Sequence, residues 1–167
     1  MRAVSLLLES QDLPLWKSRR DKAKRPHLPL KNEWYTVNNS KQIVPTRLKQ
    51  KTESALQAAA LEQGLYGQKG QEIIREGEWS IHVKVWTPSR HIDHGLVARL
   101  RASGHTVKSA QDAASFAAVD SDGALVPVRD ALQGWMIDND WRLVQSYGES
   151  IWRPGIGPSL YVGLKRL

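Results

Sequence analysis

The chain contains no cysteine in its 167 residues, and this absence excludes disulfide bonds, thiolate zinc sites and a cysteine nucleophile together. Any metal ion must therefore be bound by oxygen or by imidazole. No apolar run approaches the roughly 20 residues that cross a bilayer, so we expect no membrane partner. The opening MRAVSLLLES has a single arginine and an apolar run too short for the core of a signal peptide. The absence of cysteine is compatible with a reducing cytoplasm, which is the location we expect.

Internal repeats with a period of about 20 to 50 residues are also absent, which argues against a repeat architecture. The length is sufficient for one domain with a hydrophobic core, and we expect a single domain over residues 1–167. A hydrophobic fraction of 41% and a charged fraction of 25% are typical of a globular protein.

Positive charge is in excess, with a formal net charge of +7. This balance favours an anionic partner, of which nucleic acid is the commonest; the alternative is a charge that serves solubility. Much of the excess lies in a predicted extended loop over residues 11–45, which four prolines interrupt. Its aromatic residues Trp16, Trp34 and Tyr35 could stack on exposed bases, although a solvated surface loop explains the same composition.

Periodicity predicts the main elements. We expect a first strand over residues 2–9 with a buried Leu6–Leu8 run, and a helix over residues 46–64 that Thr46 caps and Gly64 ends. Residues 78–87 alternate strictly between apolar and other side chains, which indicates a strand with one face in the core.

Two short helices are predicted within residues 89–118, the first capped by Asp93 and the second by Ser109. Two closing strands follow at the C-terminal end, and we expect a hairpin turn over residues 153–158 to join them. The order of elements predicts an α/β (α+β) fold: a small mixed sheet of about four strands with helices packed on it.

The stretch VDSDGALVPVRDALQGWMIDND, residues 119–140, carries acids at both ends. One interpretation is structural: Asp122 caps a helix over residues 123–134, Pro127 lies in or near its first turn, and IDND forms a polar turn. The other interpretation is a metal site, because hard Mg²⁺ is bound by carboxylates, water and phosphate. A helix of this length keeps its two ends apart, so the acids converge only if the chain turns back.

The spacing resembles that of the RusA family of Holliday junction resolvases. The resemblance rests on Asp120-Ser121-Asp122-Gly123, then Asp130-Ala131-Leu132 and Gly134, then Asp138-Asn139-Asp140 before Leu143-Val144. It covers about 25 residues specifically, and the strand SIHVKVWTP ahead of it is similar to the family's as well.

The resemblance implies a homodimeric endonuclease that binds four-way DNA junctions and cuts two opposing strands with Mg²⁺, acting in recombination, repair or phage DNA processing. It requires no small-molecule cofactor, and it implies a bacterial or phage-infected cell. Asp120, Asp122 and Asp140 match the family's catalytic carboxylates, and Asp138 stands at a less strict neighbouring position.

The chain departs from the family's pattern in three respects. The family's lysine falls on Val126, and Arg129 is our candidate for the missing positive charge. The family's basic residues before the first acid are replaced by Phe116-Ala117-Ala118-Val119. Residues 89–118 form a longer connection than we expect, which we interpret as a helical insertion.

These departures leave alternatives open. The first is a non-catalytic relative that binds branched DNA. A second places the degraded acidic motif at Arg90-His91-Ile92-Asp93-His94, where His91, Asp93 and His94 could instead bind a transition metal. Trp141 is a candidate for an aromatic wedge in the junction, although a core or interface role is the simpler explanation for the tryptophans. The predicted DNA-binding residues are Arg19, Arg20, Lys22, Lys24, Arg25, Arg99 and Arg101.

Overall fold

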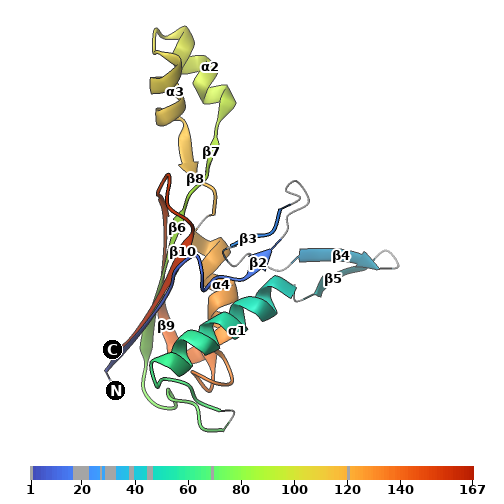
Figure 1. The fold of residues 1–167 in the computed structure, drawn as a ribbon, viewed down its shortest axis with the longest axis vertical. Helices are drawn as coiled ribbons and strands as arrows, with labels where there is room; N and C mark the ends of the chain where they lie inside the picture. The colour runs from blue at the N-terminus through green and yellow to red at the C-terminus, as the bar shows by residue number, and fades with distance from the viewer. Residues whose placement is uncertain are drawn as a thin grey trace.

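A four-stranded mixed sheet forms the centre of the computed structural model, as Figure 1 shows. The structure describes residues 2–16, 23–26, 28, 33–37, 40–44, 47–68, 70–119 and 121–167. The strand order is β1-β10-β6-β9, and the strands are β1 (Ala3–Leu8), β6 (Trp79–Thr87), β9 (Leu143–Trp152) and β10 (Ser159–Arg166). The α+β prediction is confirmed, as is the predicted strand over residues 78–87.

β10 is antiparallel to both β1 and β6, whereas β6 and β9 are parallel. The predicted hairpin between the two closing strands is therefore wrong, because β6 lies between them. The chain leaves β9 at Arg153, whose N–H donates to the Thr87 carbonyl at 2.8 Å, and it then crosses the end of β6.

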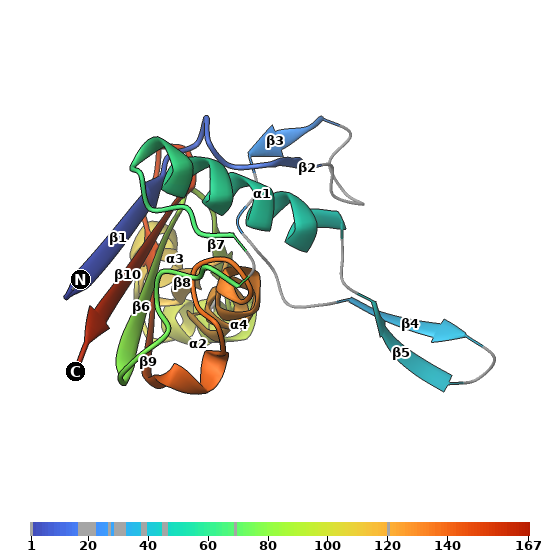
Figure 2. The ribbon, with the colours of Figure 1, turned by 90° about the horizontal axis from the view of Figure 1, so that it is seen from below.

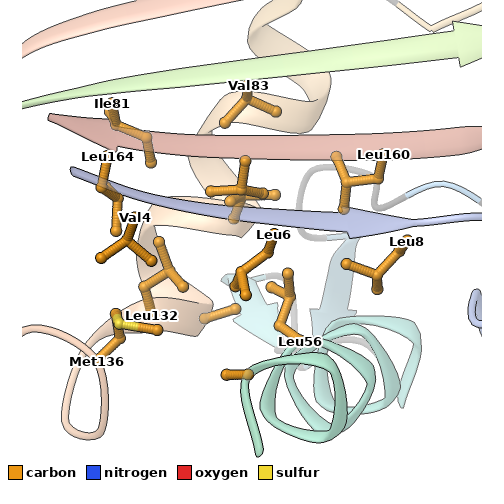
Figure 3. Packing of buried hydrophobic residues seen from close by; sticks show 14 of the residues in the cluster. Val4, Leu6, Leu8, Leu56, Ile81, Val83, Leu132, Met136, Leu160 and Leu164 are labelled. Atoms are coloured by element: carbon orange, nitrogen blue, oxygen red, sulfur yellow. The ribbon is translucent and has the colours of Figure 1, made fainter. Parts of the chain in front are cut away.

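Two helices, α1 (Arg47–Glu62) and α4 (Ser121–Leu132), cover the same face of the sheet (Figures 1 and 2). Alternate residues of the strands point into this layer, and Ile81, Val83 and Val85 are each at most 1% exposed. Figure 3 shows Ile81 and Val83 packed with residues of β1, β10, α1 and the end of α4. The other face of the sheet has no helix on it among the described elements.

β1 is an edge strand, and this position corrects the predicted buried run. Leu6 and Leu8 are fully buried, but Leu7 between them is 50% exposed on the open face. α1 follows its prediction more closely: Gly64 has φ +67° just beyond its last turn, and the Leu65 N–H donates to the Ala60 carbonyl at 2.7 Å. The predicted cap Thr46 lies outside the described residues.

The predicted loop over residues 11–45 contains two short ribbons within its described part. One pairs β2 (Leu15–Trp16) with β3 (Arg25–Pro26), and the other pairs β4 (Glu33–Val37) with β5 (Ser40–Val44). Over the described residues, no helix is both long enough and apolar enough to cross a membrane.

Residues 90–117 form an arm that projects away from the sheet in Figure 1. A ribbon of β7 (Arg90–Ile92) and β8 (Ser115–Ala117) carries the helices α2 (His94–Ala102) and α3 (Val107–Ala113). Asp93 caps α2 as predicted, accepting the Leu96 N–H at 2.9 Å. The cap predicted at Ser109 is wrong, because Thr106 accepts the Ser109 N–H at 3.2 Å and caps α3 three residues earlier.

Candidate functional site

α4 begins at Ser121, which places Asp122 in its first turn and makes the predicted cap at Asp122 wrong. Asp122 is exposed, and a carboxylate at this end of a helix is stabilised by the helix dipole. The start of α4 is held against β9, because the Ser150 hydroxyl donates to the Val119 carbonyl. Asp120 lies outside the described residues, so its position relative to Asp122 is known from the sequence alone.

Pro127 lies in the middle of α4 and not near its first turn, which corrects the second part of that prediction. The helix remains in place because its inner face is completely buried: Ala124, Val128 and Leu132 are each at most 1% exposed. Its 12 residues span about 18 Å. Backbone positions in the first and last turns of α4 are therefore well separated.

The chain leaves α4 through Gly134, which has φ +87°, and then pairs with the segment before β6. The Ile74 N–H donates to the Met136 carbonyl at 2.9 Å, and the Asp138 N–H donates to the Ile74 carbonyl at 3.2 Å. Met136 and Ile137 are fully buried, so this turn is anchored on both sides. A short 3₁₀ helix, η1 (Asp140–Arg142), follows the turn and directly precedes β9.

Asp138 forms a salt bridge with Arg142. The Arg142 Nε and Nη2 atoms donate to the two carboxylate oxygens of Asp138 at 2.5 and 2.9 Å. This bidentate hydrogen bond lowers the pKa of Asp138 and raises the pKa of Arg142. Both oxygens already have a charged partner, so Asp138 is poorly placed to bind a metal ion.

Asp140 faces Arg129, the arginine we expected to act near Asp122. The Arg129 Nη2 atom lies 3.9 Å from Asp140 Oδ2, a loose ion pair in which both side chains are partly exposed. Arg129 stands seven residues after Asp122, in the last turn of α4. The positive charge of Arg129 therefore lies beside Asp140.

Asp122 and Asp140 thus lie at opposite ends of α4 within one chain. Magnesium binds its oxygen ligands at about 2.1 Å, so two carboxylates that share one ion must lie side by side. Among the residues that the structure describes, no three His, Asp or Glu side chains come together as a metal site. Asp120 lies outside the described residues, so the set of Asp120, Asp122 and Asp140 stays a prediction.

The alternative placements at the start of the arm have local roles. Asp93 is occupied as the α2 cap, and the His91 Nε2 atom lies 3.0 Å from the Ala118 carbonyl across the ribbon. His94 is the first residue of α2 and is exposed. These contacts account for Asp93 and His91 without a metal.

The predicted DNA-binding residues divide into three groups. Arg19, Arg20 and Lys22 lie outside the described residues, whereas Lys24 and Arg25 are exposed at β3. Arg99 and Arg101 are exposed in the last turn of α2, near the far end of the arm. In the whole sequence, residues 17–51 hold eleven of the 24 Lys and Arg but only two of the 17 acids, so the remainder of the chain is slightly acidic.

A core or interface role was predicted for Trp79, Trp135, Trp141 and Trp152, of which two lie in the core and two are exposed. Trp79 and Trp135 are each 3% exposed, whereas Trp141 is 59% exposed and Trp152 is 40% exposed. Arg142 lies 4.5 Å from the Trp141 ring, and Arg90 lies 4.1 Å from the Trp152 ring. These two exposed rings mark the two ends of β9.

The sequence did not reveal the polar network on the open face of the sheet. Glu149 accepts a hydrogen bond from Lys84 Nζ at 2.7 Å and lies 3.3 Å from His82 Nε2. Lys84 is the main cause of the lowered pKa of Glu149. The alternation of residues in β6 predicted that His82 and Lys84 share one face of the strand. It did not predict that this face has no helix packed on it among the described elements.

Comparison with protein-family models finds none that matches this chain, and comparison with curated protein sequences finds no match either. The similarity to the RusA family therefore rests on the residues named above.

Proposed function

We propose that this protein binds branched DNA and cuts it as a divalent-cation-dependent endonuclease of the RusA type. The observation that carries the proposal is the arrangement around α4. An exposed acid stands in its first turn, and a second acid stands at the entrance of the strand that follows, at the spacing the RusA resemblance requires. A protein that only binds polyanions has no evident use for acids in this pattern.

The distribution of charge supports the DNA-binding part. The positive excess is concentrated in residues 17–51, and a second exposed group of cations, Arg99, Arg101 and Lys108, lies along the arm. The two acids of the arm have partners, since Asp93 caps α2 and Asp112 pairs with Arg90 at 3.1 Å. The arm therefore presents mainly positive charge to a phosphate backbone.

A second candidate function is binding of branched DNA without cleavage. The separation of Asp122 from Asp140 within one chain favours it, as does Val126 at the family's lysine position. In this case the acids of α4 act only on the stability of the helix.

The deciding experiment incubates the full-length protein with a labelled synthetic four-way junction, with and without Mg²⁺. Under the first proposal, two symmetric incisions appear only with the cation, and a linear duplex of the same sequence stays intact. Under the second candidate, the junction is bound more tightly than the duplex in a mobility-shift assay, and no product forms.

Asp122→Asn tests the role of the α4 acid. We expect cleavage to fall by orders of magnitude while junction binding persists, because the side chain keeps its shape and loses the charge that attracts a cation. Glu62→Gln is the control, since it removes a negative charge from an exposed helical position outside the acidic motif. If Asp122→Asn cuts the junction at the wild-type rate, Asp122 has only a structural role.

A further inference from the structure

The face of the central sheet that α1 and α4 leave uncovered (Figure 2) holds a pocket of about 470 Å³. The pocket extends across all four strands. Its lining includes a row of residues that are partners across the sheet, namely Ser5, Gly163, His82 and Tyr147 of β1, β10, β6 and β9. Its size is within the range of ligand pockets in proteins, roughly 300 to 1,000 Å³. Because α4 packs on the opposite face of the sheet, this pocket is not part of the candidate acidic site.

Gly163 allows the ring of Tyr161 to lie against β10. These two residues are two positions apart in the strand and therefore share the open face. A Cβ atom at Gly163 would lie 2.7 Å from Tyr161 Oη and 3.0 Å from its Cε1 atom, which is closer than a side chain allows. The ring thus occupies the space that any other residue at position 163 would fill. Since Tyr161 is only half-buried and lines the pocket, part of its ring remains accessible from the pocket.

His82 stands nearly at a right angle to this ring. The centroids of the Tyr161 and His82 rings are 6.2 Å apart, and their planes meet at 81°. His82 Nε2 lies 3.3 Å from Glu149 Oε2, a contact that orients the imidazole. A flat group stacked on Tyr161 would therefore have the imidazole at its edge. Tyr147, which is 56% exposed and is the partner of His82 on β9, adds a further aromatic ring to the pocket.

The charge of the pocket favours an anionic ligand. Among the described residues that line it, none is acidic, and Lys165 contributes an exposed ammonium group. Glu149 is not part of the lining, and Lys84 neutralises it through a contact of 2.7 Å. Aromatic rings beside a cation, without a free carboxylate, fit a planar ring that carries a phosphate. Nucleotides have this chemistry.

We propose that this pocket binds an unpaired nucleotide of a nucleic-acid strand, with its base stacked on Tyr161 and its phosphate beside Lys165. Stacking on an aromatic side chain requires no particular base, because every base has a flat face. A base within a duplex is already stacked on both sides, so fully paired DNA, including a fully paired four-way junction, does not enter the pocket. The proposal does not rest on the nuclease function, because binding of a single strand requires no cleavage.

Fluorescence anisotropy of a labelled oligothymidine of about 12 nucleotides, titrated with the full-length protein, tests the pocket. Tyr161→Leu removes the stacking ring and should weaken binding about tenfold, the effect of losing one stacked base, whereas Tyr161→Phe keeps the ring and should bind as the wild type does. Gly163→Ala keeps Tyr161 but displaces its ring, so it should also weaken binding. Tyr66→Leu is the control, since Tyr66 is an exposed tyrosine that stacks on Trp135 outside the pocket.

Lys165→Gln adds a measurement that does not disturb packing, because Lys165 is exposed. The loss of one phosphate contact to a single strand should reduce the slope of log K against log salt by about 0.7 for the oligothymidine. Binding of a fully paired four-way junction should stay unchanged, because the junction offers no unpaired base to the pocket.

Equal affinity of the wild type, Tyr161→Leu and Gly163→Ala for the oligothymidine would overturn the pocket, as would a wild type that binds no single strand. Thymidine monophosphate that competes at the same concentration as the oligothymidine would show that the ligand is a free nucleotide, and it would overturn the assignment to a strand. If the protein cuts no junction but Tyr161→Leu and Lys165→Gln have the expected effects, the nuclease function is refuted and the pocket is retained.

Discussion

At the scale of single residues, the Asp138–Arg142 pair fixes the turn between α4 and β9. Removing it with Asp138→Asn should lower the free energy of unfolding by about 1 kcal/mol near neutral pH, since the pair is bidentate but partly exposed. The pKa of Asp138 is lowered in the folded state, so its contribution is complete above the ordinary Asp pKa of 3.8 and is lost as the pH falls through the lowered value. Urea unfolding at pH 7 and at successively lower pH should show the two proteins converging only below about pH 4. A difference that is the same at every pH would mean that the charge of Asp138 contributes nothing.

At the scale of elements, the arm of residues 90–117 has its own small core, in which Val97, Ala110 and Ala114 are buried apart from the main cluster. We therefore expect the arm to unfold locally while the sheet stays folded.

Asp93→Ala removes the α2 cap and should destabilise the arm by about 1 kcal/mol, whereas Asp93→Asn keeps an acceptor and should change the stability very little. Hydrogen exchange is the measurement: amides of α2 and α3 should exchange faster in Asp93→Ala, while those of β6 and β10 are unchanged. Equal acceleration in β6 would show that the arm and the sheet unfold as one unit.

At the scale of the whole molecule, the separation of charge between residues 17–51 and the remainder predicts a strong salt dependence of DNA binding. Each phosphate contact contributes about 0.9 to the slope of log K against log salt. Changing both Lys24 and Lys51 to Gln should therefore reduce the slope by up to about two and weaken binding at low salt. Lys165→Gln is the control, since it removes an exposed lysine at the end of β10, outside the basic segment. Fluorescence anisotropy over a salt series measures these slopes, and identical slopes for all variants would exclude the two lysines from the interface.

The sequence by itself determined the features that depend on neighbours along the chain. The alternation of Ile81, Val83 and Val85 was sufficient to predict β6, because a strand places every second side chain on one face. The helix α1 and the Asp93 cap followed from equally local rules, since a cap and the N–H it accepts are three residues apart.

Only the tertiary structure decided which strands are neighbours, which faces are covered and which acids can meet. Leu7 is exposed because β1 forms an edge, and β9 does not pair with β10 because β6 lies between them; neither relation is contained in the local sequence. The spacing in the sequence predicted that Asp122 and Asp140 belong to one metal-binding site. In the structure Asp122 lies in the first turn of α4, whereas Asp140 contacts Arg129 in the last turn, because burial of Val128 and Leu132 fixes the inner face of the helix in the core.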